Sequence, residues 1–225
     1  MRGAVADLLA SRGDFAPRAE RVPIARALAI AVLAGALYGT ALGSLGLRPL
    51  AVLYAACKVP LLLVVTTAVC LPSYRFLLGV LGLGRDFSAA LRAIVCAQAA
   101  AALALGSLAP VTAFFHASGV SYPAALLLAT GAFAAAAVAG QAVLVRHLRP
   151  LVARDRRHAR ALLAWFGLHA FVAVKLAWVL RPFVGDPALP VAFLREQRWH
   201  ENPYASLFWG AVGLAHAVVG RLLAG

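Results

Sequence analysis

Long apolar runs, separated by short polar or charged breaks, make up most of this 225-residue chain. A helix crosses the hydrocarbon core of a bilayer with about 20 residues, and five of the runs reach that length. The pattern predicts an all-α fold, a polytopic transmembrane helical bundle with five core spans. The expected spans are residues 24–45, 50–71, 91–115, 123–145 and 161–183.

Two further segments flank the five core spans. Residues 204–223 are apolar and form either a sixth span or a helix on the membrane surface. Their small residues recur at helical spacing, whereas a surface helix would carry a charged face, so the sixth span is favoured. Residues 1–23 mix arginines with acidic residues and are expected to be a cytoplasmic N-terminal segment. Residues 24–225 are then expected to form a single helical membrane domain.

The second span has two registers because Pro60 lies inside its apolar run. In one register, a helix kinked at Pro60 crosses the membrane over residues 50–71. In the other, the span begins at Pro60, residues 50–57 form an interfacial helix, and Lys58 extends to the membrane surface. Residues 72–86 begin with a proline and contain three glycines, and they are expected to connect the second span to the third.

The composition agrees with a membrane protein, because 63% of the residues are hydrophobic and only 13% are charged. Mean hydropathy is +0.87. A net charge of +13 would suit a nucleic-acid partner, but the basic residues lie in short segments between apolar runs and do not alternate with aromatic residues. The charge therefore indicates membrane topology, and no nucleic-acid partner is expected.

The strongest topological marker is the segment of residues 146–160, which carries a net charge of +5. Arginine-rich loops remain in the cytoplasm, so the N-terminus is expected there as well, with the uncharged connector of residues 116–120 outside. A multi-pass protein of the bacterial inner membrane is expected. The basic segment would also contact anionic lipid headgroups. Its arginines are Arg146, Arg149, Arg154, Arg156, Arg157 and Arg160.

Small residues at helical spacing predict faces on which helices pack closely. In the first span, Gly35, Gly39 and Gly43 are four residues apart, and in the fourth span Gly131 belongs to another face of small residues. Spacing does not tell whether the packing partner is a helix of the same chain or of a second subunit. The same chain is favoured, and a homo-oligomer or a membrane-protein partner stays open.

Lys58 and Lys175 are the only two lysines, and both lie in apolar runs. Counted from the outer ends of their spans, each is about 12 Å deep, which suggests one chamber that binds an anion such as an anionic lipid headgroup. The alternative is that each lysine reaches the membrane surface independently. Trp178 is placed to shield Lys175 by a cation–π contact, and Arg181 is expected at the outer headgroups.

Other polar groups carry no recognisable catalytic chemistry. Gln98 is expected to make an interhelical hydrogen bond, and His169 to be a hydrogen-bonded packing residue on a different face from Lys175. The three cysteines form no CxxC pair, and no HExxH or GxSxG motif occurs. All eight carboxylates lie outside the spans, which disfavours proton coupling. No metal site, no cofactor and no enzymatic activity are expected.

Six short strings together resemble a group of small bacterial multispan membrane proteins, and the layout is similar to that of Yip1-type membrane proteins. The resemblance covers residues 27–185 and implies a five-span core with a cytoplasmic N-terminus, in which the last helix would be an addition or lie on the surface. The strings are YGTALGSLG at 38–46, CKVPLLL at 57–63, CLPS at 70–73, SLAP at 107–110, SYP at 121–123 and AWVLRPFVG at 177–185.

Two functions follow as expectations. The first is a non-enzymatic integral membrane protein that acts by binding lipid, in particular anionic lipid, or membrane-protein partners. The second is a transporter or channel for an anionic solute or lipid, with Lys58 and Lys175 lining its path.

Overall fold

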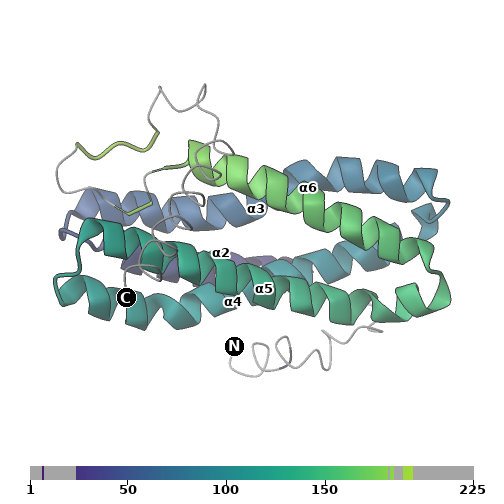
Figure 1. The fold of residues 1–225 in the computed structure, drawn as a ribbon, viewed down its shortest axis with the longest axis horizontal. Helices are drawn as coiled ribbons and strands as arrows, with labels where there is room; N and C mark the ends of the chain where they lie inside the picture. The colour runs from purple at the N-terminus through teal and green to yellow at the C-terminus, as the bar shows by residue number, and fades with distance from the viewer. Residues whose placement is uncertain (1–6, 8–23, 182, 185–189, 195–225) are drawn as a thin grey trace, which may run out of the picture.

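The computed structural model describes residues 7, 24–181, 183–184 and 190–194. Its regular elements are all helical, with no strand in these ranges (Figure 1). They are α2 (Ile24–Gly43), α3 (Pro49–Val80), the 3-10 turn η2 (Gly84–Asp86), α4 (Phe87–Ala117), α5 (Tyr122–Arg154) and α6 (Arg157–Val179). Residues 1–6, 8–23 and the sixth span expected at 204–223 lie outside the described residues.

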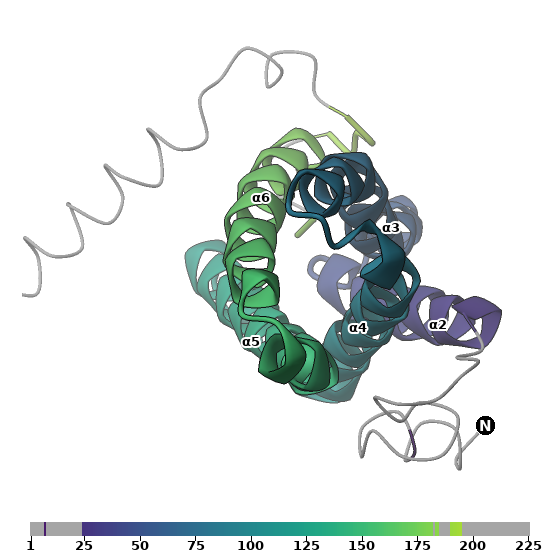
Figure 2. The same cartoon turned by 90° about the vertical axis from the view of Figure 1, so that its right-hand side faces the viewer.

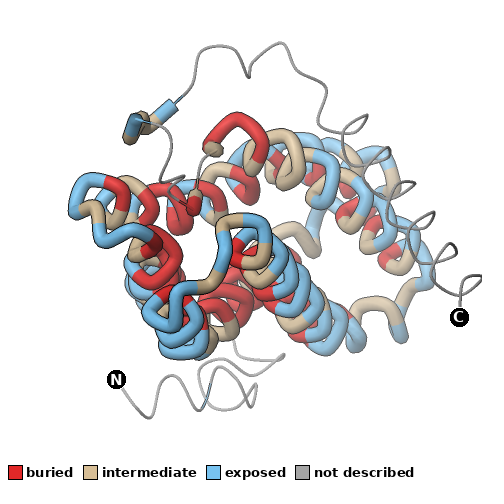
Figure 3. Tube along the Cα trace, turned by 60° about the vertical axis from the view of Figure 1, so that its left-hand side comes forward, coloured by how far each residue is buried: buried red, intermediate tan, exposed pale blue. Residues whose placement is uncertain are grey.

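Each of the five long helices is long and apolar enough to cross a membrane. The all-α fold and the five core spans are therefore confirmed. Buried residues line the inner sides of the helices and exposed residues the outer sides (Figure 3). Large apolar side chains such as Phe76, Leu127 and Val138 are at least 70% exposed. An outer surface of this kind suits lipid rather than water.

Helices α3, α4, α5 and α6 form a ring when the bundle is viewed end-on, and α2 packs outside it against α3 and α4 (Figure 2). Short links join the helices at two ends of the bundle. The links of residues 81–86 and 155–156 define the basic end. The links of residues 44–48 and 118–121, with the residues that follow α6, define the far end.

Glycines of α2 bring its backbone against α3. A Cβ atom at Gly39 would overlap the carbonyl group of Ala55, and one at Gly43 would lie 2.7 Å from the carbonyl oxygen of Ala51. At Gly35 the nearest atom of α3 would be 3.4 Å away. The glycine face of the first span thus contacts a helix of the same chain.

Gly131 differs from the packing face predicted for the fourth span. It is exposed, and nothing lies within 4 Å of a Cβ atom built on it. Gly140 makes the close contact instead, since its Cβ atom would lie 2.9 Å from the carbonyl oxygen of Ala97 on α4. The two glycines are nine residues apart, which at about 100° per residue puts them on opposite faces of α5.

Two helices extend beyond the predicted spans. The connector expected from Pro72 is helical as far as Val80, and α5 continues past residue 145, the predicted end of the fourth span, through Pro150 to Arg154. A proline inside a helix bends it without ending it when tertiary contacts hold the following turns. On α3, Tyr74 supplies such a contact, with its ring centre 5.1 Å from that of Trp165 on α6. Pro60 also lies inside α3, so residues 50–57 belong to the same helix as the rest of the span.

Candidate functional site

A cavity of about 820 Å³ is lined by residues of α3, α4, α5 and α6 and by residues that follow α6. On α5 its wall extends from Tyr122 to Leu144, which is about 33 Å at helical rise. The hydrocarbon core of a bilayer is about 30 Å thick, so the cavity has the depth of the membrane. Most of its wall consists of alanine, leucine and phenylalanine side chains.

The cavity opens sideways between α5 and α6. A two-residue link joins these helices at the basic end, and they make few contacts elsewhere. They diverge toward the far end (Figure 1). Several residues of the cavity wall along this gap are exposed: Thr130, Ala134 and Ala137 on α5, and Ala170 on α6. This side of the cavity wall is therefore partly exposed to the surroundings of the bundle.

Residues that follow α6 cover the far end of the cavity. Phe183 and Val184 line it, and the Phe183 ring centre is 5.8 Å from that of Phe133 on α5. Trp178 and Arg181 line the same end, with the Arg181 guanidinium carbon 3.8 Å from the Trp178 ring centre. Arg181 carries the one formal charge among the described lining residues.

A polar band crosses the otherwise apolar wall. Gln98 on α4 and His169 on α6 are joined by a hydrogen bond of 2.8 Å between their Nε2 atoms. This bond confirms the interhelical hydrogen bond predicted for Gln98 and the hydrogen-bonded role predicted for His169. The imidazole also stacks on Trp165, with 5.3 Å between the ring centres.

Two further polar groups of the band lack a partner. Thr66 on α3 is 2% exposed, and its Oγ1 atom makes no hydrogen bond. On α5 the buried Oε1 atom of Gln141 makes none either. A buried polar atom left unpaired costs about 1–3 kcal/mol. Neither residue was singled out from the sequence, although a polar side chain inside an apolar run was the available signal.

Neither lysine lines this cavity, in contrast to the shared chamber that their spacing suggested. Lys58 is 0% exposed, so it does not reach the membrane surface, and its Nζ atom lies 5.1 Å from the centre of the Phe193 ring. Lys175 is half-buried. It follows the lining residue Phe166 by nine residues, which places it on the opposite face of α6.

The two lysines also differ in depth. Contacts between Cys70 and Leu168 and between Tyr74 and Trp165 fix the antiparallel register of α3 and α6. Continued toward the far end, this register sets Lys58 opposite residue 180, about 7 Å beyond Lys175. The equal depth expected from the sequence fails because α3 extends beyond α6 at the far end. The cation on Trp178 is Arg181, where Lys175 was expected.

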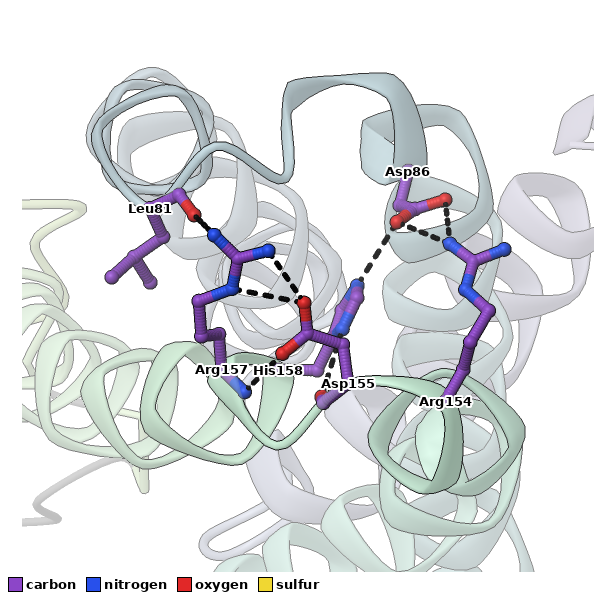
Figure 4. Close-up of polar contacts among 6 residues, drawn as sticks. All are labelled: Leu81, Asp86, Arg154, Asp155, Arg157 and His158. Atoms are coloured by element: carbon purple, nitrogen blue, oxygen red, sulfur yellow. Dashed lines mark hydrogen bonds and ion pairs between the residues drawn. The ribbon is translucent and has the colours of Figure 1, made fainter.

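At the basic end, ion pairs join the links (Figure 4). Asp86 accepts two hydrogen bonds from Arg154, of 2.8 and 2.7 Å, and His158 Nε2 lies 3.2 Å from the same carboxylate. Asp155 accepts a 2.9 Å hydrogen bond from the side chain of Arg157, which also donates to the carbonyl oxygen of Leu81. The hydrogen bonds that Arg157 donates to its carboxylate lower the pKa of Asp155 from 3.8 to about 2.

The six arginines predicted as a cytoplasmic basic loop are all exposed, but they do not form a loop. Arg146, Arg149 and Arg154 lie on α5. Arg157 and Arg160 lie on α6, and only Arg156 belongs to the two-residue link. The positive charge therefore lies on the adjoining ends of α5 and α6, where the carboxylates of Asp86 and Asp155 pair with arginines.

Comparison of the chain with protein families, with curated proteins and with solved structures gives no match. The Yip1-like layout therefore stays a prediction. Within the described ranges, no group of three histidine, cysteine, aspartate or glutamate residues could hold a metal ion. The site can bind through apolar contact and neutral hydrogen bonds, with one arginine at its far end.

Proposed function

We propose that this protein is a non-enzymatic integral protein of the bacterial inner membrane that binds a lipid in the cavity among α3, α4, α5 and α6. The observation that carries the proposal is an apolar cavity as deep as the membrane that opens sideways between α5 and α6. Its 820 Å³ falls within the range of about 300–1,000 Å³ typical of ligand sites. A lipid would enter laterally without leaving the hydrocarbon.

The distribution of arginines supports an orientation with the basic end in the cytoplasm. All six arginines of residues 146–160 lie at that end, whereas Arg48 and Arg181 lie at the far end. Positive residues favour the cytoplasmic side, which would also hold the start of α2. Each exposed arginine near an anionic surface contributes about 1 kcal/mol to its attraction.

The alternative is a transporter or channel for an anionic solute or lipid that uses Lys58 and Lys175. Its support is weaker, because neither lysine lines the cavity and, among the described lining residues, Arg181 alone brings a positive charge to the wall. Gly35, Gly39 and Gly43 already contact α3, so this glycine face does not offer a surface to a membrane-protein partner.

The test compares two exposed alanines of α5 that are two residues apart. Ala137 lines the cavity and Ala135 does not. Native mass spectrometry of gently extracted protein should show lipid retained by the wild type and by Ala135→Phe. The Ala137→Phe variant should lose that lipid, because the ring fills the cavity at its lateral opening. Equal retention by both variants, or no retention by the wild type, would refute lipid binding in the cavity.

The same measurement on the double variant Lys58→Met/Lys175→Met separates the alternatives. Cavity binding predicts that this variant keeps the lipid, because neither side chain lines the wall. Selective loss of an anionic lipid would instead support the anion path. The charge-state distribution in the same spectra reports whether the variant remains folded.

A further inference from the structure

We propose that the middle of the cavity binds the hydroxyl group of an uncharged amphiphile, such as a long-chain alcohol or an acylglycerol. The inference rests on the proposed function and names the chemical class of its ligand. It starts from the polar band of Thr66, Gln98, Gln141 and His169, all four of which line the cavity. No two of them are on the same helix.

The contacts between helices place the four side chains at a similar depth. Gln98 bonds to His169, and Gly140, next to Gln141, packs on Ala97, next to Gln98. Thr66 is one helical turn from Cys70, whose sulfur lies 3.9 Å from the carbonyl oxygen of Leu168, next to His169. The band thus spans about one turn of helix, or roughly 5 Å.

Two polar atoms of the band make no hydrogen bond. The hydroxyl of Thr66 can donate and accept, and Oε1 of Gln141 can accept, yet neither has a hydrogen bond. Threonines in membrane helices commonly bond to their own backbone, as Thr67 does with a 3.0 Å bond to the carbonyl oxygen of Leu63. Thr66, its buried neighbour in the sequence, makes no such bond and lines the cavity.

The charge of the wall excludes an ionised headgroup in this band. No carboxylate or lysine is among the described residues that line the cavity. Arg181 lies two residues beyond the end of α6 and twelve residues from His169, which is about 18 Å at helical rise. An ion held in the band would lack a counter-charge in a medium of low dielectric constant, which is costly. The ligand group that reaches the band is therefore uncharged.

A hydroxyl fits the two unpaired atoms better than an ether or a ketone. It can accept a hydrogen bond from Thr66 and donate one to Gln141, whereas an ether or a ketone can only accept. A monoacylglycerol has two hydroxyl groups, and both would lie within the single turn of helix that the polar band spans. The apolar tail would extend toward the far end, where Leu105, Leu126 and Phe133 line the wall.

The experiment measures binding of 1-hexadecanol and of its methyl ether to the full-length protein in phosphatidylcholine nanodiscs, by native mass spectrometry. Hexadecanol should bind more tightly than the ether. The Thr66→Val variant should bind hexadecanol about fivefold more weakly, which is the effect of one lost hydrogen bond. The control is Thr67→Val, which should match the wild type because that residue does not line the cavity.

Each outcome has a defined meaning. Equal loss in the Thr66 and Thr67 variants, or equal binding of alcohol and ether by the wild type, would overturn the inference. The proposed function would stand in that case if Ala137→Phe still removed the retained lipid. Where Thr66→Val does not fold, Gln141→Leu replaces it, with the same weakening expected for the alcohol and none for the ether. Loss of neither ligand in any variant, Ala137→Phe included, would refute both proposals.

Discussion

Two interfaces of this bundle are rich in small residues, but they have opposite structures. Between α2 and α3, glycines let the backbones touch, and a Cβ atom at Gly39 has no room. Between α5 and α6, alanines such as Ala137 and Ala173 line an open cavity. Small side chains permit close approach but do not cause it. The same composition therefore forms either a tight seam or a binding space, depending on how the helices diverge.

The largest effect is expected for Gly39→Leu at the tight seam. Its side chain would collide with the backbone of α3 and force the two helices apart, at a cost of more than about 3 kcal/mol. Thermal unfolding in detergent should show a strongly lowered midpoint. Gly131→Ala is the control and should be nearly neutral, because nothing lies within 4 Å of its Cβ position. Equal midpoints for the two variants would contradict the seam.

In protein stripped of lipid, a substitution in the polar band is expected to change stability by less than Gly39→Leu does, and to raise it. Thr66→Val removes an unpaired buried hydroxyl and should raise the free energy of unfolding by about 1 kcal/mol. Thr67→Val breaks an existing hydrogen bond and should not be stabilising. Urea unfolding of the delipidated variants measures both. Destabilisation by Thr66→Val would mean that its hydroxyl has a partner in the fold.

Ala173→Leu on α6 tests the side of the bundle where the cavity is open. It enlarges the side chain by about as much as Gly39→Leu does. The leucine extends into the cavity, so the stability of the delipidated protein should stay within about 1 kcal/mol of the wild type. The thermal midpoint tests this directly beside Gly39→Leu. A loss as large as that of Gly39→Leu would show that α5 and α6 close on each other when no lipid is present.

Between pH 5 and pH 2, the ion pairs of the basic end should show the smallest effect. The pKa of Asp155 falls from 3.8 to about 2 on folding, because Arg157 donates hydrogen bonds to the ionised carboxylate. Its contribution to stability is therefore present above about pH 4 and is lost as the pH falls toward 2. The thermal midpoint of the wild type should decrease more over this interval than that of Asp155→Asn. An equal decrease in the thermal midpoint of both proteins would show that the ionised carboxylate of Asp155 does not contribute to stability.

The fold was largely predictable because apolar length alone marks membrane helices. The differences are at the ends of two helices: residues from Pro72 were predicted as a connector but continue α3, and α5 runs past residue 145, the predicted end of the fourth span, to Arg154. What holds the helix beyond Pro72 is a contact of Tyr74 with Trp165, 91 residues away in sequence. No local pattern contains that information.

The site was less predictable. Gln98 and His169 were recognised as polar residues inside spans, but their bond with each other depends on how α4 faces α6. Thr66 and Thr67 are neighbouring threonines in the same apolar run, so the sequence does not distinguish them. Helix packing alone makes Thr66 line the cavity, whereas Thr67 bonds to its own backbone. The two lysines were predicted to form a site because they are the only lysines in the chain. Lys175, however, lies on the face of α6 away from the cavity. The direction of a side chain within the bundle is set by tertiary structure.

The two-residue link between α5 and α6 has a further consequence for which lipids reach the cavity. The link and its ion pairs close the gap at the basic end, and the helices separate only toward the far end. In the proposed orientation, with the basic end in the cytoplasm, the wider part of this gap would face the outer leaflet, so a bound lipid would be drawn mainly from that monolayer.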